Sequence, residues 1–175
     1  MFYPVGWNIF SSYATKRKKL AEAMILKGEL DSVRKLCLDH TIILVPTHSS
    51  NLDSILVGYM VDAIAGLPAF SYGAGLNLFD SEFFAFFMNR LGAYKVDRRK
   101  KNQIYLQTLS SYSKLIAMEG VHSIFFPGGT RSRSGEVEDR LKLGLLNSLL
   151  LAQRNLIQQE SLRKIIIVPA VLSYE

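Results

Sequence analysis

The sequence TIILVPTHSSNLD, residues 41–53, decides the fold that we expect. Its first six residues are mostly apolar and rich in β-branched side chains, which favour strands. A short run of this kind is typical of a strand buried on both faces, and such strands occur in parallel sheets that helices cover on both sides. The polar residues that follow are expected to begin the loop at the carboxyl end of this strand.

Expected strands and helices alternate along the rest of the chain. Further strands are predicted at PAFSYG (68–73), AYKVD (93–97), HSIFFP (122–127) and KIIIVPAVL (164–172). Helices are predicted at residues 12–38 with an interruption at Gly28, about 50–65, 78–92, about 100–118 and 139–154. This alternation predicts an α/β layered domain with a largely parallel or mixed central sheet flanked by helices. We assign residues 1–40 to an N-terminal helical region and residues 41–175 to the main domain.

Composition narrows the class of protein and of partner. The 175 residues suit one domain, and a hydrophobic content of 49% excludes a disordered chain. The formal net charge of +6 favours an anionic partner, such as a phosphate ester, a coenzyme, acidic lipid or nucleic acid. The single cysteine, Cys37, excludes an internal disulfide, and no Cys/His spacing indicates a metal site. The longest uncharged run, residues 63–79, contains Pro68 and falls short of the ~20 apolar residues of a spanning helix.

His48 and Asp53 are candidates for a catalytic pair. A neutral imidazole accepts a proton near neutral pH, and a carboxylate bonded to its other ring nitrogen fixes the tautomer and stabilises the imidazolium. The two side chains can meet if His48 lies in a loop and Asp53 in the first turn of the next helix, with Ser50 as N-cap. The same placement has a purely structural interpretation, in which Ser50 and Asp53 form a capping box. These residues alone leave both interpretations open.

Two further polar stretches follow expected strands, where ligand sites collect in parallel α/β sheets. GAYKVDRRKK (92–101) contains Lys95 and Arg98, and basic charge at a helix start is relieved by a bound anion. In FPGGTRSRSG (126–135), two glycines let backbone N–H groups face an anion, and arginines alternate with serines. Each stretch also has an ordinary interpretation, as a solvated basic helix start or an exposed glycine–serine turn.

Together and in this order, the stretches resemble the sequence blocks of the glycerolipid acyltransferases, the family of the glycerol-3-phosphate and 1-acylglycerol-3-phosphate (lysophosphatidate) acyltransferases. HSSNLD (48–53) resembles the family's His-x4-Asp block, GAYKVDR (92–98) the second block, and FPGGTRSRSG (126–135) the third, which reads Phe-Pro-Glu-Gly-Thr-Arg-Ser in the family. IIIVPAVLSYE (165–175), with Pro169, resembles the fourth block, and Lys142-Leu143-Gly144 resembles the Lys-x-Gly that follows the third. The resemblance covers residues 41–175, which it identifies as an acyltransferase domain.

The resemblance implies an enzyme of phospholipid synthesis that moves a fatty acyl group from acyl-CoA or acyl carrier protein to a hydroxyl of glycerol-3-phosphate, with no further cofactor. It implies His48 as the general base and Asp53 as the residue that orients it. The remaining implied site residues are Lys95, Arg98, Arg131 and Arg133 for the acceptor phosphate, Gly128, Gly129 and Thr130 for the loop and oxyanion, and Lys142 and Pro169. Lysophosphatidate is the alternative acceptor, and a non-catalytic module that binds lipid phosphates is an alternative of another class. We expect no nucleic-acid partner.

Two features depart from the family pattern. Gly128 replaces the glutamate of the third block, an acid that the family ties to acceptor binding and loop order. The chain also stops at Glu175, directly after the fourth block, whereas family members usually continue. We therefore expect either a fragment or a minimal form, with altered acceptor placement.

Aromatic residues are concentrated in LFDSEFFAFFMNRLG (78–92). The apolar side chains are Phe79, Phe83, Phe84, Phe86, Phe87 and Met88. Adjacent residues on a helix are about 100° apart, so this set does not share one narrow stripe. Two interpretations stay open: the side chains bind the acyl chain or insert at the cytoplasmic face of a membrane, as in a peripheral or monotopic protein, or the helix is fully buried. In the first case, the basic KRKK at 16–19 would attract anionic lipid.

Overall fold

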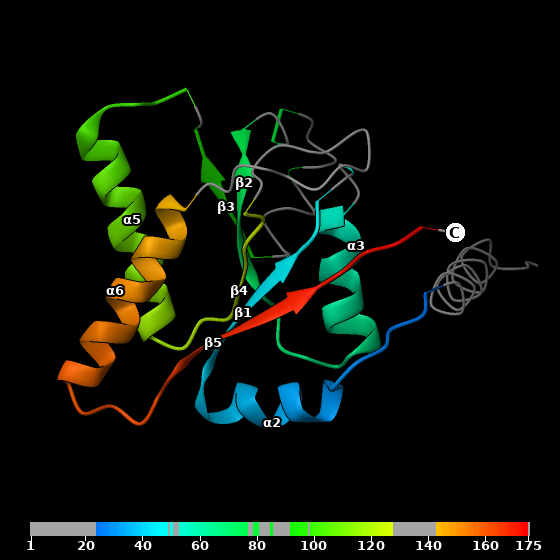
Figure 1. Ribbon diagram of the computed structural model, residues 1–175. Coiled ribbons are helices and arrows are strands. Elements are labelled where there is room, and N and C mark those ends of the chain that lie inside the picture. The colour runs from blue at the N-terminus through cyan, green and yellow to red at the C-terminus, as the bar shows by residue number, and fades with distance from the viewer. Residues whose placement is uncertain are drawn as a thin grey trace, which may run out of the picture.

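The computed structural model describes residues 24–48, 50, 53–76, 79–80, 85, 92–97, 99–127 and 143–174 (Figure 1). The helices are α2 (Leu30–Asp39), α3 (Asp53–Tyr59), the π-helical segment η1 (Met60–Ile64), α5 (Gln103–Met118) and α6 (Gly144–Gln158). The strands are β1 (Thr41–Pro46), β2 (Ser71–Gly75), β3 (Ala93–Val96), β4 (Ser123–Ile124) and β5 (Ile165–Ala170). Each predicted strand is present, and the bounds of β1 agree with the prediction.

The described strands form one sheet in the order β3-β2-β4-β1-β5, and every neighbouring pair is parallel. The prediction of an α/β domain with a parallel sheet is therefore confirmed. β1 lies between β4 and β5, and its pairing with β5 runs from Thr41 opposite Ile165 to Pro46 opposite Ala170. Because these strands point the same way, the loops that follow β4, β1 and β5 start side by side at one edge of the sheet.

Helices cover both faces of the sheet. Figure 1 shows α5 and α6 together on one side of the sheet and α3 on the other. Ile42 belongs to the core beneath α2, α3 and η1, whereas Ile43 belongs to the core beneath α5 and α6. Both side chains are 0% exposed, because successive residues of a strand point to opposite faces. Burial of each such side chain stabilises the fold by roughly 1.5–3 kcal/mol, so β1 joins the two cores.

Two glycines mark helix boundaries, Gly28 before the start of α2 and Gly66 after the end of η1. Within the predicted helix at 12–38, the described residues become helical only after Gly28, which has φ +131°. The helix predicted at about 50–65 consists of α3 followed by η1, and it ends before Gly66, which has φ +60°, a conformation that glycine tolerates. Most of the predicted helix at 78–92 lies outside the described residues. In the described part of the chain, no helix has the length and apolar character needed to cross a bilayer.

Four strands differ from their predicted bounds: β3 (Ala93–Val96) and β5 (Ile165–Ala170) are slightly shorter than predicted, and β2 and β4 differ more. The strand predicted at 68–73 begins only at Ser71, which agrees with the lack of an N–H on Pro68 for a strand ladder. The strand predicted at HSIFFP is limited to the two residues of β4, although the Phe125 N–H still donates to the Leu44 carbonyl at 2.9 Å. The contact between β4 and β1 therefore continues toward the carboxyl edge of the sheet.

A buried histidine holds the amino end of β1. His122 is 8% exposed, and its Nδ1 accepts a hydrogen bond from the Ile42 N–H at 3.1 Å. Its ring packs against Phe70, with ring centroids 5.2 Å apart. Burial lowers the pKa of His122, and the charge of Arg163 lowers it further. An Nδ1 that accepts this bond carries no proton, so the fold favours neutral His122.

We expect acid to weaken the fold through His122. An unfolded histidine titrates near pH ~6.5, and the folded pKa is lower, so the neutral ring stabilises the fold above that pH and this contribution is lost as the pH falls. His122→Asn keeps an acceptor that cannot be protonated. The Tm of both proteins is expected to fall between about pH 8 and pH 5. If the hydrogen bond to His122 is worth about 1 kcal/mol, this fall is roughly 2–4 °C smaller in His122→Asn than in the wild type. Thermal melts followed by circular dichroism measure the difference.

His40→Asn is the matched control, because its ring accepts only a longer, exposed bond of 3.4 Å from the Lys164 N–H. This variant is expected to keep the wild-type dependence of Tm on pH. A His122→Asn melt with the same pH dependence as the wild type would contradict the role assigned to His122.

Candidate active site

His48 and Asp53 meet at the carboxyl end of β1. His48 lies two residues beyond the strand, and Asp53 is the first residue of α3. The His48 Nδ1 and the Asp53 Oδ2 are 3.1 Å apart. The carboxylate is 0% exposed, and the imidazole side chain keeps 16% of its surface exposed. The two side chains are thus in contact, with part of the imidazole open to solvent.

The same carboxylate also caps the start of α3. The Ser50 N–H donates to the Asp53 Oδ2 at 2.7 Å, and the Asp53 N–H donates to the Ser50 carbonyl at 3.3 Å. This is the backward arm of a capping box, with an aspartate in the acidic position. The two interpretations left open by the sequence are therefore not exclusive, because one oxygen atom serves both contacts.

These contacts select one tautomer of His48. An ionised carboxylate can only accept hydrogen bonds, so the Nδ1 that faces Asp53 carries the proton. The Nε2 then has a free lone pair in the neutral ring. This arrangement suits a general base whose second nitrogen is held by a carboxylate.

Tyr174 is a further partner of the carboxylate, and the sequence did not indicate it. Its phenol O–H donates to the Asp53 Oδ1, the oxygen that His48 and Ser50 do not use in their bonds. Burial of the phenol, and then its bond to Asp53 and the charge of that residue, raise the pKa of Tyr174 to about 12. The phenol therefore stays neutral near pH 7 and remains a donor.

The segment that carries Tyr174 is attached to the residue before His48. The Thr47 N–H donates to the Ala170 carbonyl at 3.1 Å, and the Thr47 Oγ1 accepts from the Leu172 N–H at 2.9 Å. The contact between β1 and β5 thus continues beyond the last strand residues. This continuation brings Tyr174 to Asp53.

Phe126 contacts His48 from the other neighbouring strand. It lies two residues beyond β4, and its ring centroid is 4.5 Å from that of His48, with the planes inclined by 37°. Phe126 is the first residue of FPGGTRSRSG, so this loop begins directly at the imidazole. The three adjacent strands β4, β1 and β5 therefore each supply a residue to one site.

Lys95 lies farther from this pair. It is an exposed residue of β3, which is separated from β1 by β2 and β4, or about 14 Å at the usual strand spacing of about 4.8 Å. Its Nζ lies over the ring of Phe79, 5.1 Å from the centroid. Pro169 lies on β5 and pairs with Val45 of β1, one position before the last pair of these two strands. The structure thus does not bring Lys95 or Pro169 into contact with His48 and Asp53.

The basic stretch after β3 contains its own ion pair. The Arg99 Nε donates to the Asp97 Oδ1 at 3.0 Å. The hydrogen bonds from Arg99 hold the pKa of Asp97 below its usual value, and the same pairing raises the pKa of Arg99. Asp97 therefore compensates Arg99, its neighbour two residues away.

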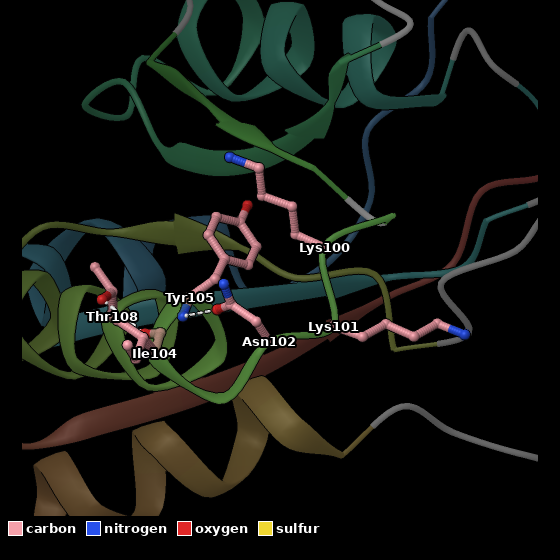
Figure 2. A pocket seen from close by; sticks show the side chains of 6 residues that line it. All are labelled: Lys100, Lys101, Asn102, Ile104, Tyr105 and Thr108. Atoms are coloured by element: carbon pink, nitrogen blue, oxygen red, sulfur yellow. Dashed lines mark hydrogen bonds between the residues drawn. The ribbon is translucent and has the colours of Figure 1, made fainter.

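A shallow depression of about 440 Å³ lies at the start of α5 (Figure 2). It is lined by Lys100, Lys101, Asn102, Ile104, Tyr105 and Thr108. The Asn102 Oδ1 caps the helix by accepting from the Tyr105 N–H at 2.7 Å. Figure 2 shows the two lysine side chains pointing in opposite directions, and the Lys100 Nζ lies 5.5 Å from the centre of the Tyr105 ring. The lysines are therefore not arranged as a joint clamp.

Most of the predicted phosphate and loop residues lie outside the described residues. These are Arg98, Gly128, Gly129, Thr130, Arg131, Arg133 and Lys142. Among the residues that the structure describes, no group of three or more His, Cys, Asp or Glu side chains could hold a metal ion.

Comparisons with known proteins find acyltransferases. The family model described as Acyltransferase matches residues 19–173. The glycerol-3-phosphate acyltransferase of Haemophilus ducreyi is 34% identical over 147 residues, which is 83% of this chain and 17% of that protein. The glycerol-3-phosphate acyltransferase of Xylella fastidiosa is 28% identical over 145 residues, which is 75% of this chain and 16% of that protein. This chain thus spans about a sixth of the length of these relatives.

One solved structure is also similar. It is the 1-acyl-sn-glycerophosphate acyltransferase of Thermotoga maritima, with 20% sequence identity and a TM-score of 0.45. The match covers 83% of this chain and 61% of that one.

Proposed function

This chain belongs to the acyltransferase family, and on that premise we propose that it transfers a fatty acyl group from a thioester donor to a hydroxyl of glycerol-3-phosphate. The observation that carries the proposal is the contact of the His48 Nδ1 with the buried carboxylate of Asp53, which in the neutral ring makes the Nε2 the proton acceptor. The proposed donor is acyl-CoA or acyl carrier protein, since either supplies an activated thioester.

In the proposed reaction, the acceptor hydroxyl gives its proton to the His48 Nε2 while its oxygen forms a bond to the thioester carbonyl carbon. The tetrahedral intermediate then breaks its C–S bond, and the departing thiolate takes the proton from the imidazolium. Asp53 keeps the ring in the required tautomer and stabilises its positive form. General-base assistance of this kind is worth roughly 10²–10⁴-fold in rate. No covalent enzyme intermediate is needed, because the thioester is already activated.

The loop that begins at Phe126 is the proposed source of the oxyanion and phosphate contacts. Backbone N–H groups of Gly128, Gly129 and Thr130 would stabilise the oxyanion, with Gly128 in place of the family's glutamate. The contact of Phe126 with His48 supports this, because it starts the loop beside the proposed base. Arg131 and Arg133, a few residues later, would bind the acceptor phosphate. Lys142 would support the loop from its far end.

Arg98 and Lys95, at the end of β3, are proposed to reach the same phosphate from the other direction. The separation of about 14 Å between β3 and β1 can be bridged by a glycerol phosphate together with an extended arginine side chain. Lysophosphatidate is the alternative acceptor, since it presents the same phosphate and a free hydroxyl. The net charge of +6 supports an anionic acceptor in either case.

We also propose that the protein acts at the cytoplasmic surface of a membrane, as a peripheral or monotopic protein. The acyl chain and the product are both lipidic, and the aromatic residues between 79 and 88 are too numerous for one narrow helix stripe. Phe83 and Phe86 would insert among the lipid chains, and KRKK at 16–19 would attract anionic head groups.

His48→Ala is expected to abolish acyl transfer, a loss of roughly 10²–10⁴-fold or more, while the protein remains folded. The assay follows thiol release from acyl-CoA that depends on added glycerol-3-phosphate. His40→Ala, which changes a histidine at the opposite end of β1, is the control and should keep full activity. Full activity of His48→Ala would refute the proposed mechanism, and wild-type protein without any thiol release would favour the non-catalytic binding module.

Arg131→Ala is expected to raise the apparent KM for glycerol-3-phosphate roughly 10–100-fold, with a smaller change in kcat, because an arginine–phosphate bond is lost from both the bound substrate and the transition state. Arg154→Ala, an exposed change on α6, should leave the KM unchanged. The same assay with lysophosphatidate as acceptor decides between the two acceptors. An unchanged KM in Arg131→Ala would remove Arg131 from the phosphate site.

Phe83→Asp and Phe86→Asp are expected to reduce co-sedimentation with vesicles that contain an anionic phospholipid, because a charged side chain opposes insertion. Leu162→Asp is the control, since Leu162 is 92% exposed and lies before β5, at the amino edge of the sheet. Equal co-sedimentation of all three variants and the wild type would count against the membrane role of the aromatic residues.

A further inference from the structure

The Asp53 carboxylate accepts hydrogen bonds from three parts of the chain. The Oδ2 faces the His48 Nδ1 and the Ser50 N–H, and the Oδ1 accepts from the Tyr174 O–H. The first two partners lie within five residues of Asp53, but Tyr174 is separated from it by 121 positions and lies four residues beyond β5. Of these three donors, Tyr174 is the one that links the carboxylate to a distant segment of the chain.

Rotation about the Cβ–Cγ bond moves both carboxylate oxygens, so the two donors on the Oδ2 already oppose it. The Tyr174 O–H on the Oδ1 adds a further restraint from a distant segment of the chain. The exposure of Tyr174 indicates that its hydroxyl group, rather than its ring, makes the important contact. The residue as a whole is 57% exposed, yet its O–H reaches a carboxylate that is 0% exposed. A tyrosine that only filled space in the core would bury its ring instead.

Hydrogen bonds that extend the pairing of β1 with β5 fix the segment that carries Tyr174. The Thr47 side chain accepts from the Leu172 N–H at 2.9 Å, and the Thr47 N–H donates to the Ala170 carbonyl at 3.1 Å. Thr47 is also the residue that precedes His48. The imidazole and the phenol are therefore attached to the carboxylate from two segments that are bonded to each other.

We infer that Tyr174 is a positioning residue of the proposed acyl transfer: its phenol O–H orients the Asp53 carboxylate, which in turn holds His48 as the Nδ1–H tautomer with Nε2 directed at the acceptor hydroxyl. The inference rests on the proposed function, because it gives Tyr174 a task only if His48 is the base. Tyr174 does not touch the substrate. Its effect on the reaction passes through Asp53.

Tyr174→Phe removes the O–H and keeps the ring. It is expected to lower kcat roughly 10-fold, a part of the roughly 10²–10⁴-fold that general-base assistance supplies, and to leave the KM for glycerol-3-phosphate within about twofold. Tyr112→Phe is the control, because Tyr112 is also a partly exposed tyrosine (43%) but lies on α5 against Tyr94. It should match the wild type in both parameters.

A double-mutant cycle separates positioning through Asp53 from a general loss of structure. In an Asp53→Asn background, Tyr174→Phe should cause no further loss of kcat, because the carboxylate through which it acts is gone. A loss of the same size in both backgrounds, or an unchanged kcat in Tyr174→Phe alone, would overturn the inference.

If Asp53→Asn leaves too little activity for the cycle, the tautomer of His48 decides. The ¹⁵N chemical shifts of the imidazole nitrogens at about pH 8 distinguish the two neutral forms. His122 is the internal reference for the opposite tautomer, since its Nδ1 accepts from the Ile42 N–H. Tyr174→Phe is expected to move His48 away from the Nδ1–H form and to leave His122 unchanged, and an unmoved His48 would overturn the inference.

The failure of this inference is distinct from that of the proposed function. Full activity of His48→Ala ends the proposed function whatever Tyr174 does. Inactive His48→Ala together with fully active Tyr174→Phe ends only the role of Tyr174.

Discussion

The geometry of the candidate site depends on one buried carboxylate, Asp53, whose two oxygens both accept hydrogen bonds. Asp53 is 0% exposed, and donors from His48, Ser50 and Tyr174 surround it. An ionised carboxylate without such donors would be costly to bury, whereas hydrogen bonds to the charged form favour it. The start of α3, the tautomer of His48 and the path of the chain after β5 are therefore linked through one side chain.

The parallel sheet makes this arrangement available. Because β1 lies between β4 and β5 and all three run in the same direction, Phe126, His48 and Tyr174 leave the sheet at one edge. The apolar residues of β1 anchor the strand that leads to this edge, because Ile42 and Ile43 are buried in the cores on opposite faces of the sheet. At the amino edge of the sheet, neutral His122 stabilises β1 by accepting a hydrogen bond from the Ile42 N–H. The candidate site and the stabilising contact of His122 thus lie at opposite ends of the same strand.

The candidate site could be predicted from the sequence where its residues are close along the chain. His48, Ser50 and Asp53 lie within six positions, and a loop followed by a helix start is enough to bring them together. The capping and pairing interpretations looked like alternatives because the sequence does not reveal how many donors one carboxylate oxygen accepts. Lys95 lies within β3, the strand farthest from β5 in the sheet, and the local sequence pattern does not reveal this strand order.

The sequence by itself determined the class of fold, because buried β-branched runs that alternate with helical segments have few other solutions than a covered parallel sheet. It also permitted the meeting of His48 with Asp53, since the two residues are close along the chain, but it left a catalytic pair and a helix cap both open. Only the tertiary structure decided that Phe126 and Tyr174 join them. Their partners are 78 and 121 positions away along the chain, and such contacts depend on which strands become neighbours, a choice made by the packing of the whole sheet rather than by any local sequence preference.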